Sequence, residues 1–555
     1  MSDGRLRLNR SLATSVLVAV GACSGCGGSQ GPNGSNVAFA GIHISPNAVA
    51  VEPDQAQVFA ATCFGSTGTP FPCPNFTWSS TGGTIDSTGT YHAGATAGNY
   101  TVTATAAGKA ATATVVIVPP GSGPVITVVP SVALQTMWGW AATAQAGQQE
   151  CDPVAFANYR DPVYDRLVNE LGINRLRVPL RSGIENPTDY FAELLAGRIT
   201  RAQWRPVRYA TINDNSDPTS VNPAGFHFTE LDHHIDNVVT PIRNRLLARG
   251  EQLYVNLNYT NFSVQGQPVL HREAPAEYAE FILAAFQHIQ SRYGWTPDAV
   301  EIMLEPDNAW WDGTEIGRVL VATGDRLAAA GFRPDFIAPS TTDMGNAITW
   351  LDDVVAIPRA TQYLTDLSYH RYGGVNDANL QTIQARALAH GLRTSMLEHI
   401  GSGYQDLHKD LTLGRNSAWQ QYIIAWCGTV DGGGNYYPVD VSTPAAPQIA
   451  IGSRTRFFQQ YFRDVRFGAV RHEATSTSST FEPLAFRNST GRWVVVVKAN
   501  GGGSFTVAGL PAATYQLTYT TGSAFRTALP DATISAGQPV IATIPATGVL
   551  TIAAQ

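Results

Sequence analysis

The chain has few charged residues and no excess of basic ones. Only 14% of its 555 residues are Asp, Glu, Lys or Arg, and the formal net charge is −7. Phosphate backbones are bound by clustered Lys and Arg, so this balance argues against nucleic acid as a partner. With 44% of its residues hydrophobic, the chain can form ordinary folded cores, and its length predicts about three domains.

Long apolar runs are also missing after the N-terminus. The run LATSVLVAV, residues 12–20, follows three arginines and is too short for a bilayer span, which needs about 20 apolar residues. This pattern predicts an export signal. The next residues, VGAC, resemble a bacterial lipobox with Cys23 as the lipidated residue. We predict a lipoprotein signal and tether over residues 1–36, with an ordinary cleaved signal as the alternative, so the mature protein is exported to the cell surface or secreted.

Cysteine is scarce, and its spacing argues against zinc. No two pairs have the C-x-x-C spacing of a structural zinc site, and no cofactor motif is present, so we expect no metal and no cofactor. With Cys23 in the anchor and Cys26 in the tether, four cysteines remain for an exported protein. We predict two disulfides, one local and one between distant segments: Cys63–Cys73 and Cys151–Cys427.

Residues 37–118 contain short alternating strands and no helical period, which predicts a small β-sandwich. The segments ISPNAVAVEPDQAQVFAAT, TWSSTGGTIDSTGTY and GNYTVTATA resemble the bacterial Ig-like domains of secreted proteins. The resemblance implies a spacer or a carbohydrate-adhesion module. The next segment, PPGSGP at residues 119–124, is expected to be a linker.

Residues 125–468 repeat an amphipathic helix, a glycine and an apolar strand. The glycines stand where a helix C-cap needs a left-handed residue: Gly172, Gly250, Gly294, Gly331 and Gly391. With TMWGWAAT, DLSYHRYGG and QYIIAWCGTV as further strands, the pattern totals eight and favours a (β/α)8 TIM barrel. An open doubly wound sheet is disfavoured because no Gly-rich phosphate loop follows the first strand.

Closure of such a barrel would place its eighth strand beside its first, and therefore Cys427 beside Cys151. From residue 469 the chain returns to short strands such as RWVVVVKAN and GSFTVAGL. These predict a C-terminal β-sandwich over residues 469–555, to which PVITVVP, just before the barrel, is a candidate extra strand.

Polar side chains stand at three strand ends, where a barrel keeps its active site. Glu305 follows the fourth strand, His370 and Tyr372 lie on the sixth, and Glu398 ends the seventh. Retaining cleavage of a glycosidic bond needs two carboxyls about 5–5.5 Å apart, one to protonate the leaving oxygen and one to attack the anomeric carbon. Two acids that close do not both ionise easily, so one is held protonated. The alternative is a structural acid paired with an arginine such as Arg177.

Five motifs make the family resemblance specific: WGWAAT, LRVPLRSGIEN, LSYHRYGG, MLEHIG and RFFQQYFRDVRFGAVRHEATSTS. From residue 125 onward the chain resembles retaining glycoside hydrolases of clan A, and most of all the family 30 group. The resemblance implies that Glu305 is the acid/base and Glu398 the nucleophile. It also implies that Tyr372 hydrogen-bonds the nucleophile, and that His370 and Arg177 line the sugar subsite.

One position departs from the clan pattern, in which Asn immediately precedes the acid/base and contacts the sugar 2-hydroxyl. Here that residue is Leu304. Either Asn308 or another group supplies the contact, or the substrate is unusual, or the site is inactive. Three tryptophans are candidate stacking platforms for sugar, with packing as the alternative: Trp310, Trp311 and Trp426.

These features predict a monomeric, exported retaining glycoside hydrolase that cleaves β-linked bonds in a poly- or oligosaccharide. Its contact with a membrane would be through the lipid alone. The alternative on the same scaffold is a catalytically silent glycan-binding protein, and a third reading is a structural adhesin. An esterase is disfavoured because no G-x-S-x-G elbow occurs near a strand end.

Overall fold

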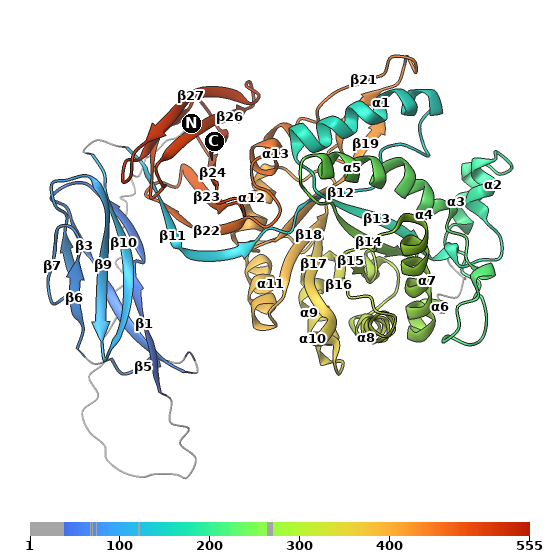
Figure 1. Cartoon of the computed structure of the whole chain (residues 1–555), viewed down its shortest axis with the longest axis horizontal. Coiled ribbons are helices and arrows are strands. Elements are labelled where there is room, and N and C mark those ends of the chain that lie inside the picture. The colour runs from blue at the N-terminus through green and yellow to red at the C-terminus, as the bar shows by residue number, and fades with distance from the viewer. Residues whose placement is uncertain (1–37, 67, 69, 74, 120–122, 263–269) are drawn as a thin grey trace, which may run out of the picture.

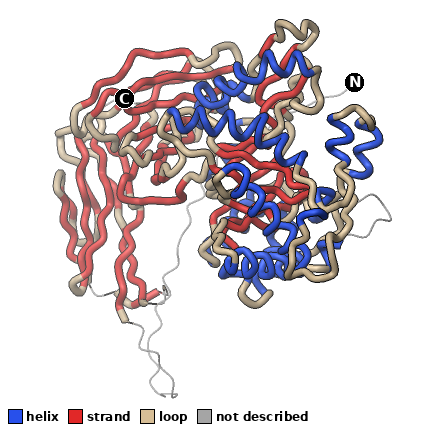
Figure 2. The backbone as a smooth tube through the Cα atoms, turned by 45° about the vertical axis from the view of Figure 1, so that its right-hand side comes forward, coloured by secondary structure: helices blue, strands red, loops and turns tan. Residues whose placement is uncertain are grey.

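The computed structural model describes residues 38–555 except 67, 69, 74, 120–122 and 263–269. The export signal and Cys23 lie outside the described residues. Two β-rich units stand beside a barrel surrounded by helices (Figures 1 and 2). Within the described ranges, no helix is long and apolar enough to cross a membrane.

The N-terminal unit is a small all-β domain, as the sequence predicts. Its core is formed by buried side chains such as Ile44, Phe59, Tyr91 and Val115. One sheet has the order β1 (Phe39–Ser45), β4 (Ala60–Gly65), β5 (Pro70–Phe71). A second has the order β2 (Ala48–Val51), β10 (Lys109–Ile117), β9 (Gly98–Ala106), β6 (Thr77–Ser80). A third consists of β3 (Ala56–Val58), β8 (Thr90–His92) and β7 (Thr84–Ile85).

The central unit is a closed barrel of eight parallel strands, which confirms the predicted fold class. In order they are β12 (Trp140–Thr143), β13 (Arg175–Arg181), β14 (Tyr254–Thr260), β15 (Ala299–Glu301), β16 (Asp335–Asp343), β17 (Leu364–Gly373), β18 (Arg393–Glu398) and β19 (Ala418–Cys427). Pairing of β12 with β19 closes the ring. All five glycines predicted as helix caps have positive φ, between 68° and 99°. Beyond β19 the sheet adds β20 (Asn435–Asp440) and β21 (Gln448–Ile449).

Helices cover the outside of the barrel (Figure 1). The longer ones are α1 (Pro153–Asp165), α5 (Thr240–Ala248), α7 (Pro275–Tyr293), α8 (Gly313–Ala329), α9 (Met344–Ala356), α11 (Asp377–Ala389), α12 (Tyr404–Thr412) and α13 (Thr455–Phe462). The shorter ones are α2 (Tyr190–Leu195), α3 (Arg201–Val207), α4 (Thr229–His234), α6 (Leu270–Glu273) and α10 (Ala360–Tyr363). Of these, α2 and α3 lie in the long excursion between β13 and β14, on the side of the barrel away from the β-rich units (Figure 1).

The C-terminal unit is a sheet-rich domain of nine strands with its own core. Its sheet order is β27 (Thr527–Ile534), β26 (Ala513–Thr521), β29 (Gly548–Ala554), β24 (Trp493–Ala499), β23 (Phe481–Arg487), β22 (Val470–Ser476), β11 (Val125–Thr136), β25 (Gly503–Ala508), β28 (Val540–Ile544). The candidate extra strand before the barrel is therefore present, as the start of β11. The unit is tied to the barrel through α13, where Gln460 donates to Thr520 and accepts from Thr551.

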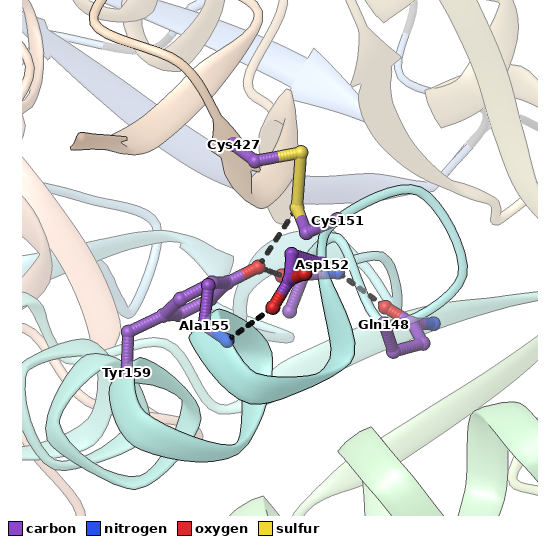
Figure 3. The surroundings of a disulfide bond; sticks show 7 residues. Gln148, Cys151, Asp152, Ala155, Tyr159 and Cys427 are labelled. Atoms are coloured by element: carbon purple, nitrogen blue, oxygen red, sulfur yellow. Dashed lines mark hydrogen bonds between the residues drawn. A yellow bond between two sulfur atoms is a disulfide. The ribbon is translucent and has the colours of Figure 1, made fainter. Parts of the chain in front are cut away.

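A disulfide links the first and last strands of the barrel, where the ring closes (Figure 3). Cys151, in the loop after β12, is bonded to Cys427 at the end of β19, with the two Cα atoms 5.6 Å apart. The Tyr159 hydroxyl of α1 packs on the Cys151 sulfur at 3.2 Å, and the Asp152 carboxylate caps the same helix through the Ala155 amide. The second disulfide joins Cys63 and Cys73 in the N-terminal domain. Both predicted pairings are confirmed.

We expect that replacing Cys151 and Cys427 together with Ser will lower the unfolding temperature of the barrel. A disulfide that closes a long loop stabilises by about 2–5 kcal/mol. Scanning calorimetry measures the shift, and the matched Cys63/Cys73 double variant should affect only the N-terminal domain. If the unfolding temperature of the barrel did not change in the Cys151/Cys427 variant, this disulfide would not stabilise the barrel.

Candidate active site

The two glutamates singled out in the sequence come together at the C-terminal mouth of the barrel. One carboxylate oxygen each of Glu305 and Glu398 and one ring nitrogen of His370 lie within 4.8 Å of one another. Both glutamates line a cavity of about 330 Å³ together with Arg177 and Trp426. At this spacing both carboxyls can reach neighbouring atoms of one bound molecule.

Glu305 is held in an unusual backbone conformation. The strand β15 ends four residues earlier than the sequence suggested, at Glu301, and Glu305 has a φ of 49° in the left-handed region. Such strain costs about 1–3 kcal/mol for a residue other than glycine and gathers at functional sites. Two hydrogen bonds hold the segment in place, from the Leu304 amide to the Tyr259 carbonyl and from the Glu305 amide to the Ser340 carbonyl.

The Glu305 carboxylate is oriented by two side chains. Asn308 Nδ2 donates to Oε2 at 3.1 Å, and His370 Nδ1 lies 3.0 Å from Oε1. The other ring nitrogen of His370 faces Arg177 Nη2 at 3.4 Å. Because a guanidinium only donates, a neutral His370 ring accepts there through Nε2 and donates from Nδ1 to Glu305, whereas a protonated ring acts on both glutamates through its charge.

Glu398 is fixed from the opposite side. Arg177 Nη1 donates to its Oε2 at 2.7 Å, and the Tyr372 hydroxyl donates to its Oε1 at 3.2 Å. Arg177 also donates through Nε to Glu301 at 2.8 Å, and Asn256 donates to the same oxygen at 2.9 Å. Arg177 is thus buried between two carboxylates, so it positions Glu398 as well as lining the cavity. Sequence reasoning missed Glu301, whose only signal was an acid inside an otherwise apolar strand.

The surroundings move the two carboxyl pKa values in opposite directions. Burial raises the pKa of Glu398, against the lowering effect of the charges on His370 and Arg177, and the charge of Glu305 raises it further. Burial also acts to raise the pKa of Glu305, but the hydrogen bond and charge of His370 outweigh it and hold that pKa below its usual value. In the ligand-free site the proton therefore prefers Glu398.

The three candidate tryptophans have different surroundings. Trp426 is 40% exposed and lines the cavity. Trp310 is 61% exposed but does not line it. The interpretation of Trp311 as a stacking platform was wrong, because it is only 3% exposed and packs against Tyr259 and Tyr278. In this turn the ring of Trp311 is buried and that of Trp310 is exposed. The sequence alone does not indicate which of two adjacent tryptophans is the buried one.

Leu304 faces the cavity, as expected for the residue before Glu305. Asn308 donates from Nδ2 to Glu305 and does not line the cavity. Asn258 on β14 lines the same cavity, and its buried Nδ2 has no hydrogen-bond partner. An unsatisfied buried donor is costly, so this amide is available to a ligand hydroxyl. Asn258 lies within an apolar strand, and sequence reasoning did not select it.

One wall of the cavity is basic. It is formed by the end of β13 and by α3 with the turn after it, and its arginines are Arg181, Arg201, Arg205 and Arg208. Arg181 pairs with Glu230, whereas no described ion pair includes the other three. Glu150 is the acid on this wall. The cluster was not predicted, because Arg201, Arg205 and Arg208 belong to an excursion without strand or motif signals, and Arg181 was read only as part of a strand.

Glu305, His370 and Glu398 are also close enough to share a metal ion. Their atoms are already engaged, however: Glu305 with His370 and Asn308, and Glu398 with Arg177 and Tyr372. Arg177 places a positive charge against the same group, which opposes cation binding. The donor set therefore fits carboxylate chemistry better than a metal centre.

The barrel and its side domain share their fold with solved glycoside hydrolase structures of family 30. The barrel and side domain resemble the catalytic domain of family 30 xylanase C from Talaromyces cellulolyticus, with a TM-score of 0.56 and 17% identity over 78% of this chain and 100% of that chain. A family 30 endoxylanase from Clostridium papyrosolvens gives 0.55 and 17% over 78% and 99%. An endo-β1,6-glucanase gives 0.56 and 17% over 81% and 97%.

Residues 38–116 match the family of bacterial Ig-like domains (group 2), so the N-terminal unit is such a domain. The comparison of the sequence with curated proteins found no match. At 17% identity the structural likeness establishes the fold of the barrel and side domain. The chemistry must be argued from the site.

We expect Glu301→Gln to destabilise the barrel by about 3 kcal/mol, because removing one partner of a buried ion pair leaves uncompensated charge. Chemical denaturation measures the loss. The matched control is Glu193→Gln, which breaks an exposed pair with Arg198 and should cost less than about 1 kcal/mol. If both substitutions lowered the free energy of unfolding equally, the buried charge of Arg177 would not need Glu301 as its partner.

Proposed function

We propose that the protein is an exported retaining glycoside hydrolase that cleaves β-linked bonds in a poly- or oligosaccharide. The observation that carries the proposal is the approach of Glu305 and Glu398 to within 4.8 Å at the barrel mouth. Retaining enzymes hold their carboxyls about 5–5.5 Å apart, whereas inverting enzymes need about 6.5–9.5 Å to admit a water. The spacing leaves no room for that water.

In the proposed reaction, Glu398 attacks the anomeric carbon while Glu305 protonates the leaving oxygen. Water then hydrolyses the glycosyl-enzyme, with Glu305 as base. Arg177 and Tyr372 hold the Glu398 oxygens in a fixed direction, which suits a nucleophile. Glu305 accepts from Asn308 and lies against His370, which suits a group that exchanges a proton with the substrate.

The pKa directions in the ligand-free site run against this assignment, since they favour a proton on Glu398. Geometry and resemblance support Glu398 as the nucleophile, whereas the pKa directions favour a proton on it. Substrate binding would have to move the proton to Glu305.

We expect Glu398→Ala and Glu305→Ala each to lower kcat by at least about 10³-fold on an aryl β-glycoside that the wild type cleaves. Azide should rescue both, with different products. At Glu398→Ala it replaces the nucleophile and gives the inverted glycosyl azide, whereas at Glu305→Ala it attacks the glycosyl-enzyme and gives the retained one. NMR of the glycosyl azides identifies the anomer that each variant forms. If Glu398→Ala gave the retained azide and Glu305→Ala the inverted one, the two roles would be reversed.

The catalytically silent glycan-binding protein remains the alternative, and Leu304 is the observation that favours it. Asn258 is the group we propose for the sugar hydroxyl that an asparagine at position 304 would contact. Intact carboxylate spacing supports the enzyme, because binding alone does not need two opposed acids. Absence of turnover on a broad glycan panel, with binding unaffected by Glu398→Ala, would favour the silent protein.

Among β-linked glycans, the basic wall favours a substrate that carries acidic groups. Arg208 stacks on the Tyr209 ring at 4.7 Å, which fixes its guanidinium, and its buried Nε has no partner. Burial lowers the pKa of Arg208, and the charges of Arg181 and Arg205 lower it further. An anion on the substrate would relieve this repulsion, and guanidinium groups bind carboxylates and sulfates well.

We expect Arg205→Gln and Arg208→Gln to raise KM about 10-fold or more on a uronic-acid or sulfated glycan, since a hydrogen bond to a charged group is worth about 1.5–3 kcal/mol. The neutral counterpart glycan should be nearly unaffected. Arg318→Gln, an exposed arginine on α8 outside the cavity, is the control. Equal losses on acidic and neutral substrates would contradict charge recognition by this wall.

We further propose that residues 1–36 direct export and attach the protein by a lipid on Cys23. The Ig-like domain, residues 37–118, and the linker 119–124 would hold the barrel and the C-terminal domain away from the surface as a monomer. The predicted start of the barrel at residue 125 is too early, because residues 125–136 form β11 of the C-terminal sheet. Two disulfides support an oxidising location outside the cytoplasm.

A further inference from the structure

Three carboxylates meet on the barrel wall, outside the catalytic cavity. Asp214 lies in the excursion between β13 and β14, and Glu277 and Glu280 are one turn apart on α7. One oxygen from each lies within 4.8 Å of the others. None of the three lines the cavity that contains Glu305 and Glu398.

Glu280 makes this group more than a cluster of surface acids. It is only 1% exposed, and neither of its oxygens has a hydrogen-bond partner. Asp214 Oδ1 and Glu277 Oε2 are also buried and unpartnered. An isolated buried carboxylate is very costly, and neighbouring like charges increase that cost.

Among the described residues, no ion pair includes Asp214, Glu277 or Glu280. The described ion pairs nearby connect Arg272 with Glu273 and Glu315 and leave the cluster out. Arg326 acts on Glu280 at longer range, but its Nη2 donates to the Thr219 carbonyl. No cationic side chain of the described residues is therefore bonded to the cluster.

The loop that carries Asp214 is already shaped. Asp214 Oδ2 accepts from Asn215 Nδ2 at 2.9 Å, and the Asp214 amide donates to Glu185 Oε1 at 3.0 Å. These bonds fix Asp214 through Oδ2 and leave Oδ1 as its unpartnered oxygen. The unpartnered carboxylate oxygens thus come from two separate chain segments, the excursion and α7.

We propose that Asp214, Glu277 and Glu280 bind a hard divalent cation, with Ca²⁺ the best match. The donors are all carboxylate oxygens, the class that Ca²⁺ prefers, and its flexible coordination of six to eight oxygens tolerates an irregular site completed by water. Mg²⁺ requires near-ideal octahedral geometry and is the poorer fit. The cation would join the excursion to α7.

The site has a consequence for the cavity wall. Arg208 and Tyr209 line the cavity a few residues before Asp214 in the same excursion. A cation at Asp214 would hold this segment against α7 and thereby keep the basic wall in place. The cation site itself does not depend on the proposed glycosidase activity.

Calorimetric titration of the chelator-treated full chain with CaCl₂ tests the proposal, with MgCl₂ as comparison. We expect one equivalent of Ca²⁺ to bind and to raise the unfolding temperature of the barrel, with Mg²⁺ at least 10-fold weaker. Glu280→Gln and the less buried Asp214→Asn should each weaken Ca²⁺ binding at least 10-fold. Glu273→Gln, an exposed acid just before α7, should bind as the wild type does.

Two results would overturn the site. If Ca²⁺ binds the wild type and both cluster variants equally, the cation lies elsewhere. If no cation binds and Glu280→Gln raises the unfolding temperature, the carboxyls share protons and form no site. Using two variants keeps the test decisive if Glu280→Gln fails to fold.

Discussion

The buried guanidinium of Arg177 is the contact on which the geometry of the site depends. It joins Glu301 on β15 to Glu398 on β18 from its own position on β13, and so links three strands that are far apart in the sequence. Removing this charge from water is costly, and only close carboxylates offset the cost. The same contact that stabilises the barrel mouth also aims Glu398. A site built this way has little freedom to reorient, which is what preorganised catalysis requires.

Much of the fold was accessible from the sequence because it rests on local rules. Glycines at helix ends marked the barrel repeats, and closure of an eight-stranded ring is what made the distant pair Cys151–Cys427 predictable. The ends of parallel strands share one edge, so Glu305 and Glu398 were expected together although they are distant in the sequence. These inferences rest on sequence periodicity and strand topology, and they require no knowledge of how side chains pack.

The remaining features depend on packing that one sequence does not reveal. Trp311 is buried against Tyr259 although its neighbour Trp310 is exposed, and β15 is too short to contain Glu305. Asn258 and the basic wall come into the cavity through segments whose composition is unremarkable. Glu301 looked like an ordinary strand residue. In each case the decisive partner belongs to another strand or loop.

The modules are arranged so that the β-rich parts lie on one side and the excursion between β13 and β14 on the other (Figure 1). The Ig-like domain contacts the C-terminal domain through buried residues that include Val116, Val118 and Val125, and Asn47 Nδ2 donates to Glu473 at 2.7 Å. The Ig-like domain therefore docks on the C-terminal domain.

The central claim is that Glu398 forms a covalent bond to the sugar. The most direct measurement is mass spectrometry of peptides after reaction with a 2-deoxy-2-fluoro glycoside of a sugar that the protein cleaves, which slows hydrolysis of the intermediate. The account predicts a single added glycosyl group on the peptide that contains Glu398. A label on Glu305, or turnover with no covalent species and inverted product, would contradict it.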